Sequence, residues 1–327
     1  MIPFQYIRPE SIKSAVDSNS KNESTAFIAG GTNLVDLMKR GVTAPEKLID
    51  ITNLSLHAIE KRNEGLYIGA LVLNSEMAEN ALVVKNHPLL SMAIKAGASQ
   101  QIRNMATTGG NILQRTRCGY FYDTVSACNK REPGSGCSAL KGYNRMHAIF
   151  GASESCIAVH PSDMCVALAA LDTKIILQST KGERTIAFTS FHKLPGTDPQ
   201  KDNILEKGEL ITGLIIPQNN FSNHSSYLKV RDRSSYAFAL VSVAASLHIN
   251  NGVIKDARLA MGGVAHKPWR LLEAEHLLKN MPANETTFKK AAEIAMKGAV
   301  GHGENNFKLK MAPKTIVQAL KQAAGIA

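Results

Sequence analysis

Four widely spaced cysteines are the residues of this sequence whose types could do the most specific chemistry. They are Cys118, Cys128, Cys137 and Cys156, and the only other cysteine is Cys165. Thiolates are soft ligands, and four that converge from loops can bind zinc or an iron-sulfur cluster. Unligated cysteines would instead behave as small apolar side chains or form disulfides. Spacing alone leaves both interpretations open.

The segment that carries these cysteines is basic, which bears on the metal. Residues 103–145 hold seven Lys and Arg against two Asp and Glu, an excess of five in a chain whose formal net charge is +11. Positive charge lowers the pKa of a thiol and offsets the negative charge of a cluster with four thiolates. The gaps between the cysteines are nine, eight and eighteen residues, whereas structural zinc sites usually contain close pairs. Of the two metals, iron-sulfur is favoured over zinc.

Length and composition describe an ordinary globular chain. Its 327 residues are 44% apolar, which at about 150 residues per domain predicts two domains. The N-terminal residues contain no apolar stretch typical of a secretory signal. The longest apolar candidate, residues 237–247, is shorter than the roughly 20 residues that a bilayer requires. The pI is near 9.4, but aromatic residues are scarce and no basic run tracks a phosphate backbone, which disfavours a nucleic-acid binder.

A glycine-rich turn near the N-terminus is typical of phosphate binding. Residues 26–29 predict a strand, Gly30-Gly31-Thr32-Asn33 a turn, and the spacing of Leu34, Leu37 and Met38 a helix. Glycine lets a backbone approach a phosphate closely. The turn matches neither the Rossmann fingerprint nor the P-loop. A tight turn that only packs a helix on a sheet therefore remains an alternative.

A second glycine pair follows a predicted helix over residues 88–98. The segment reads Thr107-Thr108-Gly109-Gly110-Asn111. Two such turns could hold the two phosphates of a dinucleotide between them.

The cysteines lie in an excursion from the regular pattern. Apolar periodicity disappears over residues 114–151, and a loop of that length needs a reason to be ordered. A cluster bound by the first three cysteines would supply three anchors, with Cys156 where regular structure resumes. Cys165 lies in a predicted apolar helix over residues 162–171 and is assigned to core packing. Ser162 or Asp163 would cap that helix, and Asp163 could also accept hydrogen bonds from ribose hydroxyls.

The remaining sequence alternates between strand and helix patterns around a boundary at residues 217–220. Strands are expected at 174–178, 186–191, 210–217, 227–230, 237–250 and 253–261, and helices at 270–278, 286–297 and 313–324. Asn250-Asn251-Gly252 predicts a hairpin turn within a small antiparallel sheet. Lys229 belongs to a charged run that is by default a solvated edge. If it instead points into a cleft between domains, it could meet an anionic ligand.

Four motifs together resemble the flavin-binding subunit of the xanthine dehydrogenase and carbon monoxide dehydrogenase family of molybdenum hydroxylases. The motifs are residues 29–34, 103–111, 161–163 and 262–268, and their order and spacing cover nearly the whole chain. The resemblance implies an α+β fold: a two-part FAD-binding domain over 1–217, then a C-terminal domain over 218–327 with a small antiparallel sheet and a helical bundle. The subdomains would span about 1–55 and 56–217, with an insertion at about 114–156. With its cysteines, the chain looks most similar to the iron-sulfur-containing flavin subunit of bacterial heterotrimeric aldehyde oxidoreductases.

The resemblance also implies two cofactors. FAD would be held by Phe27, Ile28, Ala29, Gly30, Gly31, Thr32, Asn33, Leu34, Thr107, Thr108, Gly110, Asn111, Asp163, Ile211 and Lys229. Ile211 and Lys229 would lie beside the isoalloxazine. Family members have Glu or Asp where this chain has Asn33, so an ionic contact there is not expected. Cys118, Cys128, Cys137 and Cys156 would bind one [4Fe-4S] cluster.

A subunit of this kind needs no acid, base or nucleophile of its own. The resemblance implies a heterotrimer with a molybdenum-cofactor large subunit and a [2Fe-2S] small subunit, whose electrons pass through FAD to an external acceptor. The isolated chain should then be inactive towards aldehydes. Location would be periplasmic, by co-export with a signal-bearing partner, or cytoplasmic. Two alternatives are a self-contained FAD-dependent oxidoreductase and a basic nucleic-acid-binding protein with a structural metal.

Overall fold

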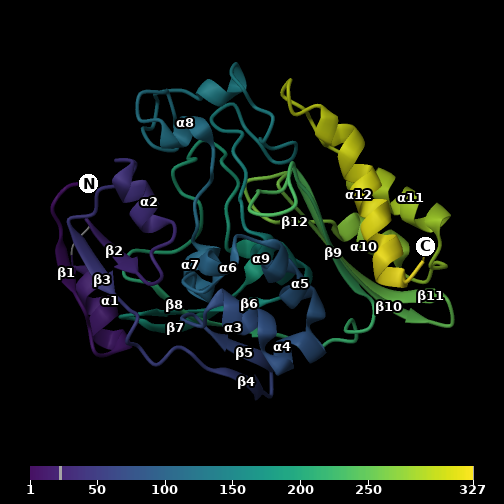
Figure 1. The fold of residues 1–327 in the computed structure, drawn as a ribbon, viewed down its shortest axis with the longest axis horizontal. Helices are drawn as coiled ribbons and strands as arrows, with labels where there is room; N and C mark the ends of the chain where they lie inside the picture. The colour runs from purple at the N-terminus through teal and green to yellow at the C-terminus, as the bar shows by residue number, and fades with distance from the viewer. Residues whose placement is uncertain (22–23, 327) are drawn as a thin grey trace.

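The structure is a computed structural model that describes residues 1–21 and 24–326. Residues 22–23 of the first expected domain and residue 327 of the second lie outside the described residues. The described chain contains three β-sheets. In Figure 1 the N-terminal sheet lies on the left, the second sheet below the centre and the C-terminal sheet on the right. The fold is α+β, as the sequence predicts.

The N-terminal sheet is small and parallel, with strand order β1-β3-β2. Its elements are β1 (Gln5–Ile7), α1 (Ile12–Ser20), β2 (Thr25–Ile28), α2 (Leu34–Lys39) and β3 (Lys47–Asp50). Helix α1 begins at a capping box in which Ser11 and Ser14 bond each other's backbone. Its buried residues Ala15 and Val16 pack with Ile49 of β3. In this unit, strand β2 ends directly before the first glycine turn.

The second sheet has the order β4-β5-β8-β6-β7. Its strands are β4 (Ile59–Arg62), β5 (Gly65–Gly69), β6 (Lys174–Ser179), β7 (Gly182–Ala187) and β8 (Leu210–Ile216). The accompanying helices are α3 (Asn74–Glu79), α4 (Ala81–Asn86), α5 (Pro88–Ala96), α6 (Gln100–Arg103), α7 (Thr108–Ile112) and α9 (Asp163–Ala170). Every residue of α9 is buried, because this helix packs between the second sheet and the C-terminal sheet.

The cysteine-bearing excursion contains little regular structure. Only α8 (Gly119–Tyr122) and the 3-10 turn η1 (Ser138–Leu140) interrupt it between α7 and α9. It forms the upper lobe in Figure 1, above the second sheet and beside the upper end of helix α12. Most of the excursion therefore lies outside the sheets. The expectation that it is not part of the core is wrong for its last residues, because Ile149 and Phe150 are buried in the C-terminal core.

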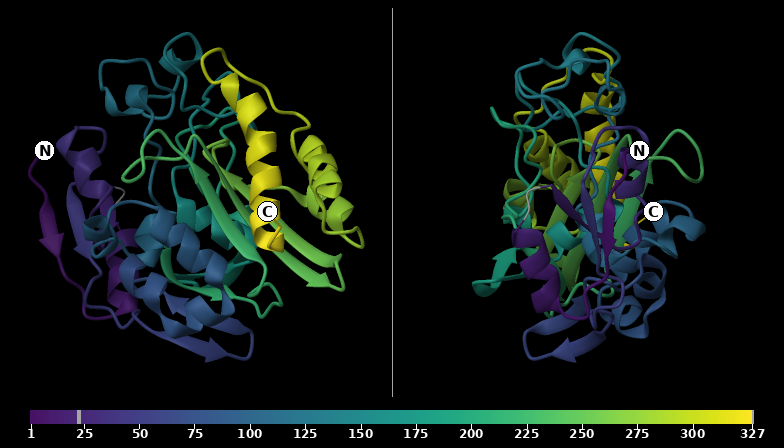
Figure 2. Two further views of the ribbon diagram at one scale, coloured as in Figure 1. Left: turned by 45° about the vertical axis from the view of Figure 1, so that its right-hand side comes forward. Right: turned by 90° about the vertical axis from the view of Figure 1, so that its left-hand side faces the viewer.

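The C-terminal sheet is antiparallel, in the order β12-β11-β10-β9. It consists of β9 (Ser225–Val230), β10 (Val241–Asn250), β11 (Val253–Gly262) and β12 (Trp269–Arg270), and is covered by α10 (Leu272–Leu278), α11 (Glu285–Ala295) and α12 (Phe307–Ala324). The left view in Figure 2 shows the C-terminal helices, in yellow, on one face of the sheet. Asn251 and Gly252 have φ of 49° and 74°, the left-handed pair that a two-residue hairpin needs. The predicted hairpin turn is confirmed.

Three local expectations were wrong. The strand expected at 186–191 lies earlier, as β7, and residues 188–190 form the 3-10 turn η2 (Phe188–Ser190). Helix α12 begins at Phe307 instead of Pro313, because buried Lys308 and Ala312 lie on its inner face and their packing outweighs the hydrogen bond that Pro313 cannot donate. The second glycine pair lies inside α7 rather than in a turn.

No helix of the described chain is both long and apolar enough to cross a bilayer.

Candidate functional site

The two glycine segments lie against each other in the structure. Gly31 has a φ of +68°, a conformation that glycine adopts without strain. At Gly30, an added Cβ would lie 1.8 Å from the carbonyl oxygen of Met105. The first glycine turn therefore packs directly on the backbone that leads into the second glycine segment. Any side chain at Gly30 would force the two apart.

In the second glycine segment, the surroundings of Gly109 and Gly110 differ. Thr107 caps α7 by accepting a hydrogen bond from the Gly110 amide at 3.3 Å. An added Cβ at Gly109 would contact Ala70 and Ile211 at 3.3 and 3.8 Å, so Gly109 packs on the sheet. Among the described residues, and apart from the backbone of its own helix and its chain neighbours, an added Cβ at Gly110 would meet only the Thr107 hydroxyl within 4 Å. Gly110 therefore exposes bare backbone.

These segments line one wall of a cavity of about 570 Å³, which we call the glycine cavity. Its lining includes Thr32, Asn33, Ala106, Gly110, Asn111, Asp163, Lys229 and Phe238. It lies between the N-terminal sheet, the helices of the second sheet and the β9–β10 loop. A groove lined by bare backbone on one side and by polar side chains on the other is typical of a site for an extended phosphate-containing ligand.

Two asparagines of the glycine segments hold the excursion in place. The Asn33 Oδ1 atom accepts a hydrogen bond from the Arg115 amide at 2.8 Å, and its Nδ2 donates to the Tyr122 hydroxyl at 3.4 Å. Asn111 Oδ1 accepts from the hydroxyl of Ser162 and from Gln114 Nε2. Asn33 is thus engaged with the excursion, a role that the sequence did not predict for it.

Asp163 and Lys229 form a buried ion pair at 2.8 Å, with side-chain exposures of 8% and 4%. Asp163 also accepts a hydrogen bond from the Tyr227 hydroxyl at 2.7 Å. Burial, followed by the Asp163 charge, raises the pKa of Tyr227 well above its usual value, so this hydroxyl stays protonated. Lys229 further donates to the Ala96 carbonyl at 3.0 Å. The default interpretation of Lys229 as a solvated edge is wrong, and the alternative, that it points into the cleft, describes its position.

The other predicted FAD residues contribute backbone or packing. Phe27 and Ala29 pack against the core of the N-terminal sheet, and Leu34 begins α2. Ile211 is buried beneath Gly109. Ser162, and not Asp163, caps α9 through the Cys165 amide at 3.1 Å. This leaves the Asp163 carboxylate available to Lys229 and to the cavity.

The structure brings the cysteine quartet to one place in the upper lobe. Cys128 and Cys137 face each other across an antiparallel bridge. The Cys156 thiol donates a hydrogen bond to the Cys137 sulfur, which lowers the pKa of Cys137 to about 6 and raises that of Cys156. Burial raises the pKa of Cys118 to about 11, and the nearby sulfurs of Cys128 and Cys137 act in the same direction. All five cysteines are free thiols.

The four thiols are spaced more widely than the ligands of a bound zinc ion. Four thiolates at about 2.3 Å from zinc would lie within about 4 Å of one another. In the described chain, no three of these sulfurs lie within 4.8 Å of one another.

Charged side chains, of which Lys130 is fully buried, hold the excursion to the rest of the protein. Lys130 lies between Cys128 and Cys137 in sequence, and its ammonium group pairs with Asp202 and donates to the Pro199 carbonyl at 2.6 Å. Arg115 binds the same carboxylate at 2.6 Å. Much of the positive charge that the sequence shows around the cysteines is therefore structural. Sequence analysis missed Asp202, since nothing in its local sequence distinguishes it from a solvated residue.

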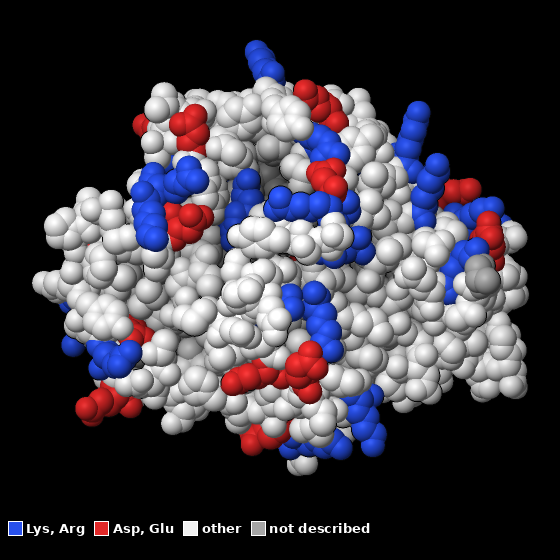
Figure 3. Space-filling view, viewed as in Figure 1, with Lys and Arg blue, Asp and Glu red and all other residues white. Residues whose placement is uncertain are grey.

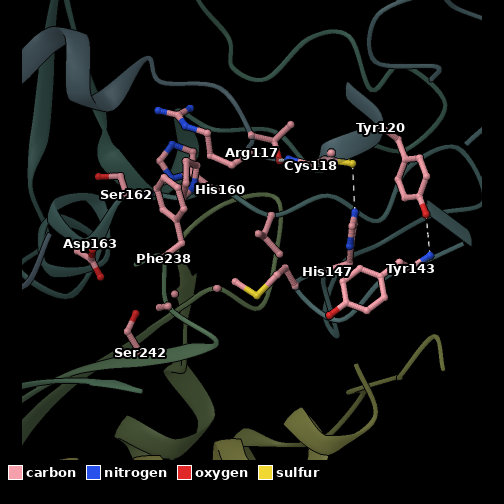
Figure 4. A pocket seen from close by; sticks show the side chains of 18 of the residues that line it. Arg117, Cys118, Tyr120, Tyr143, His147, His160, Ser162, Asp163, Phe238 and Ser242 are labelled. Atoms are coloured by element: carbon pink, nitrogen blue, oxygen red, sulfur yellow. Dashed lines mark hydrogen bonds between the residues drawn. The ribbon is translucent and has the colours of Figure 1, made fainter. Parts of the chain in front are cut away.

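A second cavity of about 460 Å³ lies between the cysteines and the glycine cavity, and we call it the thiol cavity. Figure 4 shows Cys118, His147, Tyr120 and Tyr143 on one side and Ser162, Asp163, Phe238 and Ser242 on the other. Arg117, Ser162, Asp163 and Phe238 line both cavities. Several Lys and Arg side chains lie around a hollow near the middle of the face in Figure 3. The two cavities therefore lie on either side of a shared wall.

Cys165 belongs to a different group. Its sulfur and one ring nitrogen each of His160 and His192 lie within 4.8 Å of one another. The Ser162 amide donates to His160 Nδ1 at 3.4 Å, so the proton of this ring is on Nε2, which then has no lone pair for a metal. His192 Nε2 donates to the Ile112 carbonyl at 3.0 Å. We assign this group to core packing, as predicted for Cys165.

Comparisons with known protein families match both parts of the chain. The FAD binding domain in molybdopterin dehydrogenase matches residues 2–219. The CO dehydrogenase flavoprotein C-terminal domain matches residues 226–323.

Similar proteins and structures agree with these matches. The chain is 46% identical to the aldehyde oxidoreductase FAD-binding subunit PaoB of Escherichia coli (strain K12), over 99% of each chain. It is 29% identical to the glyceraldehyde dehydrogenase medium chain of Sulfolobus acidocaldarius, over 88% of this chain and 85% of that one. A carbon monoxide dehydrogenase structure from Hydrogenophaga pseudoflava has the same fold, with a TM-score of 0.78 at 23% identity over 99% of each chain.

Proposed function

This chain belongs to the FAD-binding medium subunits of the xanthine dehydrogenase and CO dehydrogenase family, and within that family we propose that it serves a molybdenum-dependent aldehyde oxidoreductase. Its likeness to an aldehyde oxidoreductase subunit over the full length supports aldehydes as the substrate class. When bound, FAD supplies the redox chemistry, with electrons from partner subunits leaving to an external acceptor. The chain itself supplies position and electrostatics.

The glycine cavity is the proposed FAD site. The backbone of Gly30 to Asn33 and of Gly110 would hold the pyrophosphate. Thr32, Asn33 and Gly110 line the cavity, and Gly110 has open space beside its backbone, while Gly30 and Gly31 would fix the shape of the turn. Thr107, Thr108 and Asn111 would shape that wall, and Asp163 and Lys229 would bind the polar groups of the nucleotide or flavin from the opposite side. Phe27, Ile28, Ala29, Leu34 and Ile211 would support it by packing.

We further propose that Cys118, Cys128, Cys137 and Cys156 bind one [4Fe-4S] cluster. When bound, the cluster supplies one-electron chemistry. The convergence of four free thiols in the upper lobe supports a metal site, and the absence of close cysteine pairs in the sequence favours iron-sulfur over zinc. Buried Lys130 would offset part of the negative charge that four thiolates add.

The assembly is part of the same proposal. A large subunit with a molybdenum cofactor and a small subunit with [2Fe-2S] centres would complete a heterotrimer. It would work in the periplasm after co-export with a signal-bearing partner, or in the cytoplasm. The domain boundary at 217/218, the subdomains and the insertion at about 114–156 are proposed with it.

The proposal that aldehyde oxidation needs the partner subunits is tested by comparing the isolated chain with the complex. The full chain purified with FAD should fail to reduce a dye when an aldehyde is added, and should gain activity when co-purified with its partner subunits. Aldehyde turnover by the isolated chain would contradict the proposal. Rapid reduction of its flavin by NAD(P)H alone would favour a self-contained flavoenzyme.

A further inference from the structure

His147 contacts one of the proposed cluster ligands from outside the quartet. Its Nε2 atom lies 3.1 Å from the Cys118 sulfur, and Figure 4 shows the contact. We propose, as an extension of the [4Fe-4S] assignment above, that His147 donates a hydrogen bond to this sulfur and thereby raises the reduction potential of the cluster. His147 is then a positioning residue for electron transfer rather than a ligand.

The contact determines which ring nitrogen carries the proton. A thiolate bound to metal has only lone pairs to offer, so an unprotonated Nε2 at this distance would repel it. The favourable arrangement places the proton on Nε2 and directs it to the sulfur. The Nδ1 atom is buried and has no partner in the described part of the chain, so no neighbour holds the proton there instead.

Hydrogen bonds to the backbone of His147, two of them from the C-terminal domain, set its position; the ring makes none of them. Its carbonyl accepts hydrogen bonds from Lys308 Nζ at 2.9 Å and from Asn305 Nδ2 at 3.3 Å. Lys308 is fully buried and also donates to the Gly263 carbonyl at 2.7 Å. The His147 amide donates to the Asn144 carbonyl at 2.9 Å. The three bonds made by His147 use its backbone, so changing the ring leaves them in place.

The electrostatic consequence follows from the direction of the bond. Reduction adds negative charge to an iron-sulfur cluster, and part of that charge resides on the cysteine sulfurs. A hydrogen bond to a sulfur therefore stabilises the reduced state more than the oxidised state, and such bonds are among the features that set cluster potentials. Because His147 is 6% exposed and Phe would fill the space of the imidazole, the Phe variant leaves little room beside the sulfur for a water that could replace the bond.

The test is a redox titration of the full chain, purified anaerobically with FAD, in which iron content is measured for every variant. His147→Phe removes the donor and keeps the bulk, whereas His147→Gln keeps an N–H. His87→Phe is the matched control, because His87 is equally buried but bonds Asn219 far from the cysteines. The midpoint potential is read from the electron paramagnetic resonance signal of the reduced cluster.

We expect a more negative potential in His147→Phe at unchanged iron content, an intermediate or unchanged potential in His147→Gln, and no shift in His87→Phe. An unchanged potential in a fully loaded His147→Phe would overturn the role of His147. If that variant loses iron, His147→Leu and His147→Gln make the same comparison, and loss of iron in all three would make His147 a structural support only. Wild-type chain without iron would instead overturn the cluster assignment itself.

Discussion

Substitutions at two glycines of the glycine segments should have different effects. Gly110→Ala should weaken FAD binding and leave the fold stable, whereas Gly30→Ala should destabilise the fold. Gly110→Ala adds a methyl group that would lie 3.0 Å from the Thr107 hydroxyl and, beyond its own helix backbone and chain neighbours, would meet no other described atom within 4 Å. The fold should therefore tolerate it, and alanine in the interior of α7 can gain up to about 1 kcal/mol over glycine. The same methyl group occupies the space where the pyrophosphate would approach the backbone. We expect FAD affinity to fall at least about tenfold, which is about 1.4 kcal/mol.

Gly30→Ala should instead damage the fold. Its methyl group would lie 1.8 Å from the Met105 carbonyl oxygen and 3.3 Å from the Cα of Ala106. The two glycine segments would have to separate by more than about an ångström, and overpacking of this kind typically costs about 1–3 kcal/mol. We expect a lower melting temperature in the absence of FAD together with weaker FAD binding.

Two measurements on the isolated chain separate the variants: thermal unfolding without FAD, and titration of FAD by quenching of its fluorescence. Gly110→Ala should unfold at or slightly above the wild-type temperature and bind FAD weakly. Wild-type FAD affinity in Gly110→Ala would refute the placement of the pyrophosphate at this backbone. Wild-type stability in Gly30→Ala would refute the contact between the two segments.

Further predictions concern the cysteines and the buried charges. Cys156→Ser should lose iron, whereas Cys165→Ser should keep it at a modest cost in stability; iron analysis showing the reverse would mean that the fourth ligand is wrong. Burial alone would raise the pKa of Asp202, but Lys130 and Arg115 outweigh it and lower the pKa to about 2. Because this lies below the unfolded value of 3.8, the stabilisation is complete above pH 4 and is lost as pH falls towards 2. Asp202→Asn should lower the free energy of unfolding by about 3–5 kcal/mol at pH 7. In urea unfolding, the difference in this free energy between variant and wild type should shrink between pH 4 and 2. A difference that does not depend on pH would contradict the pairing.

Segments with strong local signals could be predicted from the sequence. The first glycine turn, the hairpin at Asn251-Gly252 and the buried helix that contains Cys165 are each determined by residues a few positions apart. Turn conformations and apolar periodicity depend on such short separations. The irregular conformation of the excursion could also be predicted, because its sequence lacks apolar periodicity.

Features that depend on distant contacts could not be predicted in this way. Lys130 meets Asp202 across 72 residues, and neither residue has a local pattern that indicates burial. His147 contacts Cys118 only because residues near Lys308 hold its backbone. Lys229 reads as part of an exposed charged run, yet tertiary packing buries it against Asp163. Ion pairs and hydrogen bonds of this kind are properties of the assembled fold.

The most direct test of the account is cofactor analysis of the full chain purified under anaerobic conditions. An absorbance spectrum with iron, sulfide and zinc determination should show flavin bands and about four irons and four sulfides per chain. A chain that binds FAD but carries zinc, or no metal, at the cysteine quartet would contradict the assignment of these four thiols to an iron-sulfur cluster.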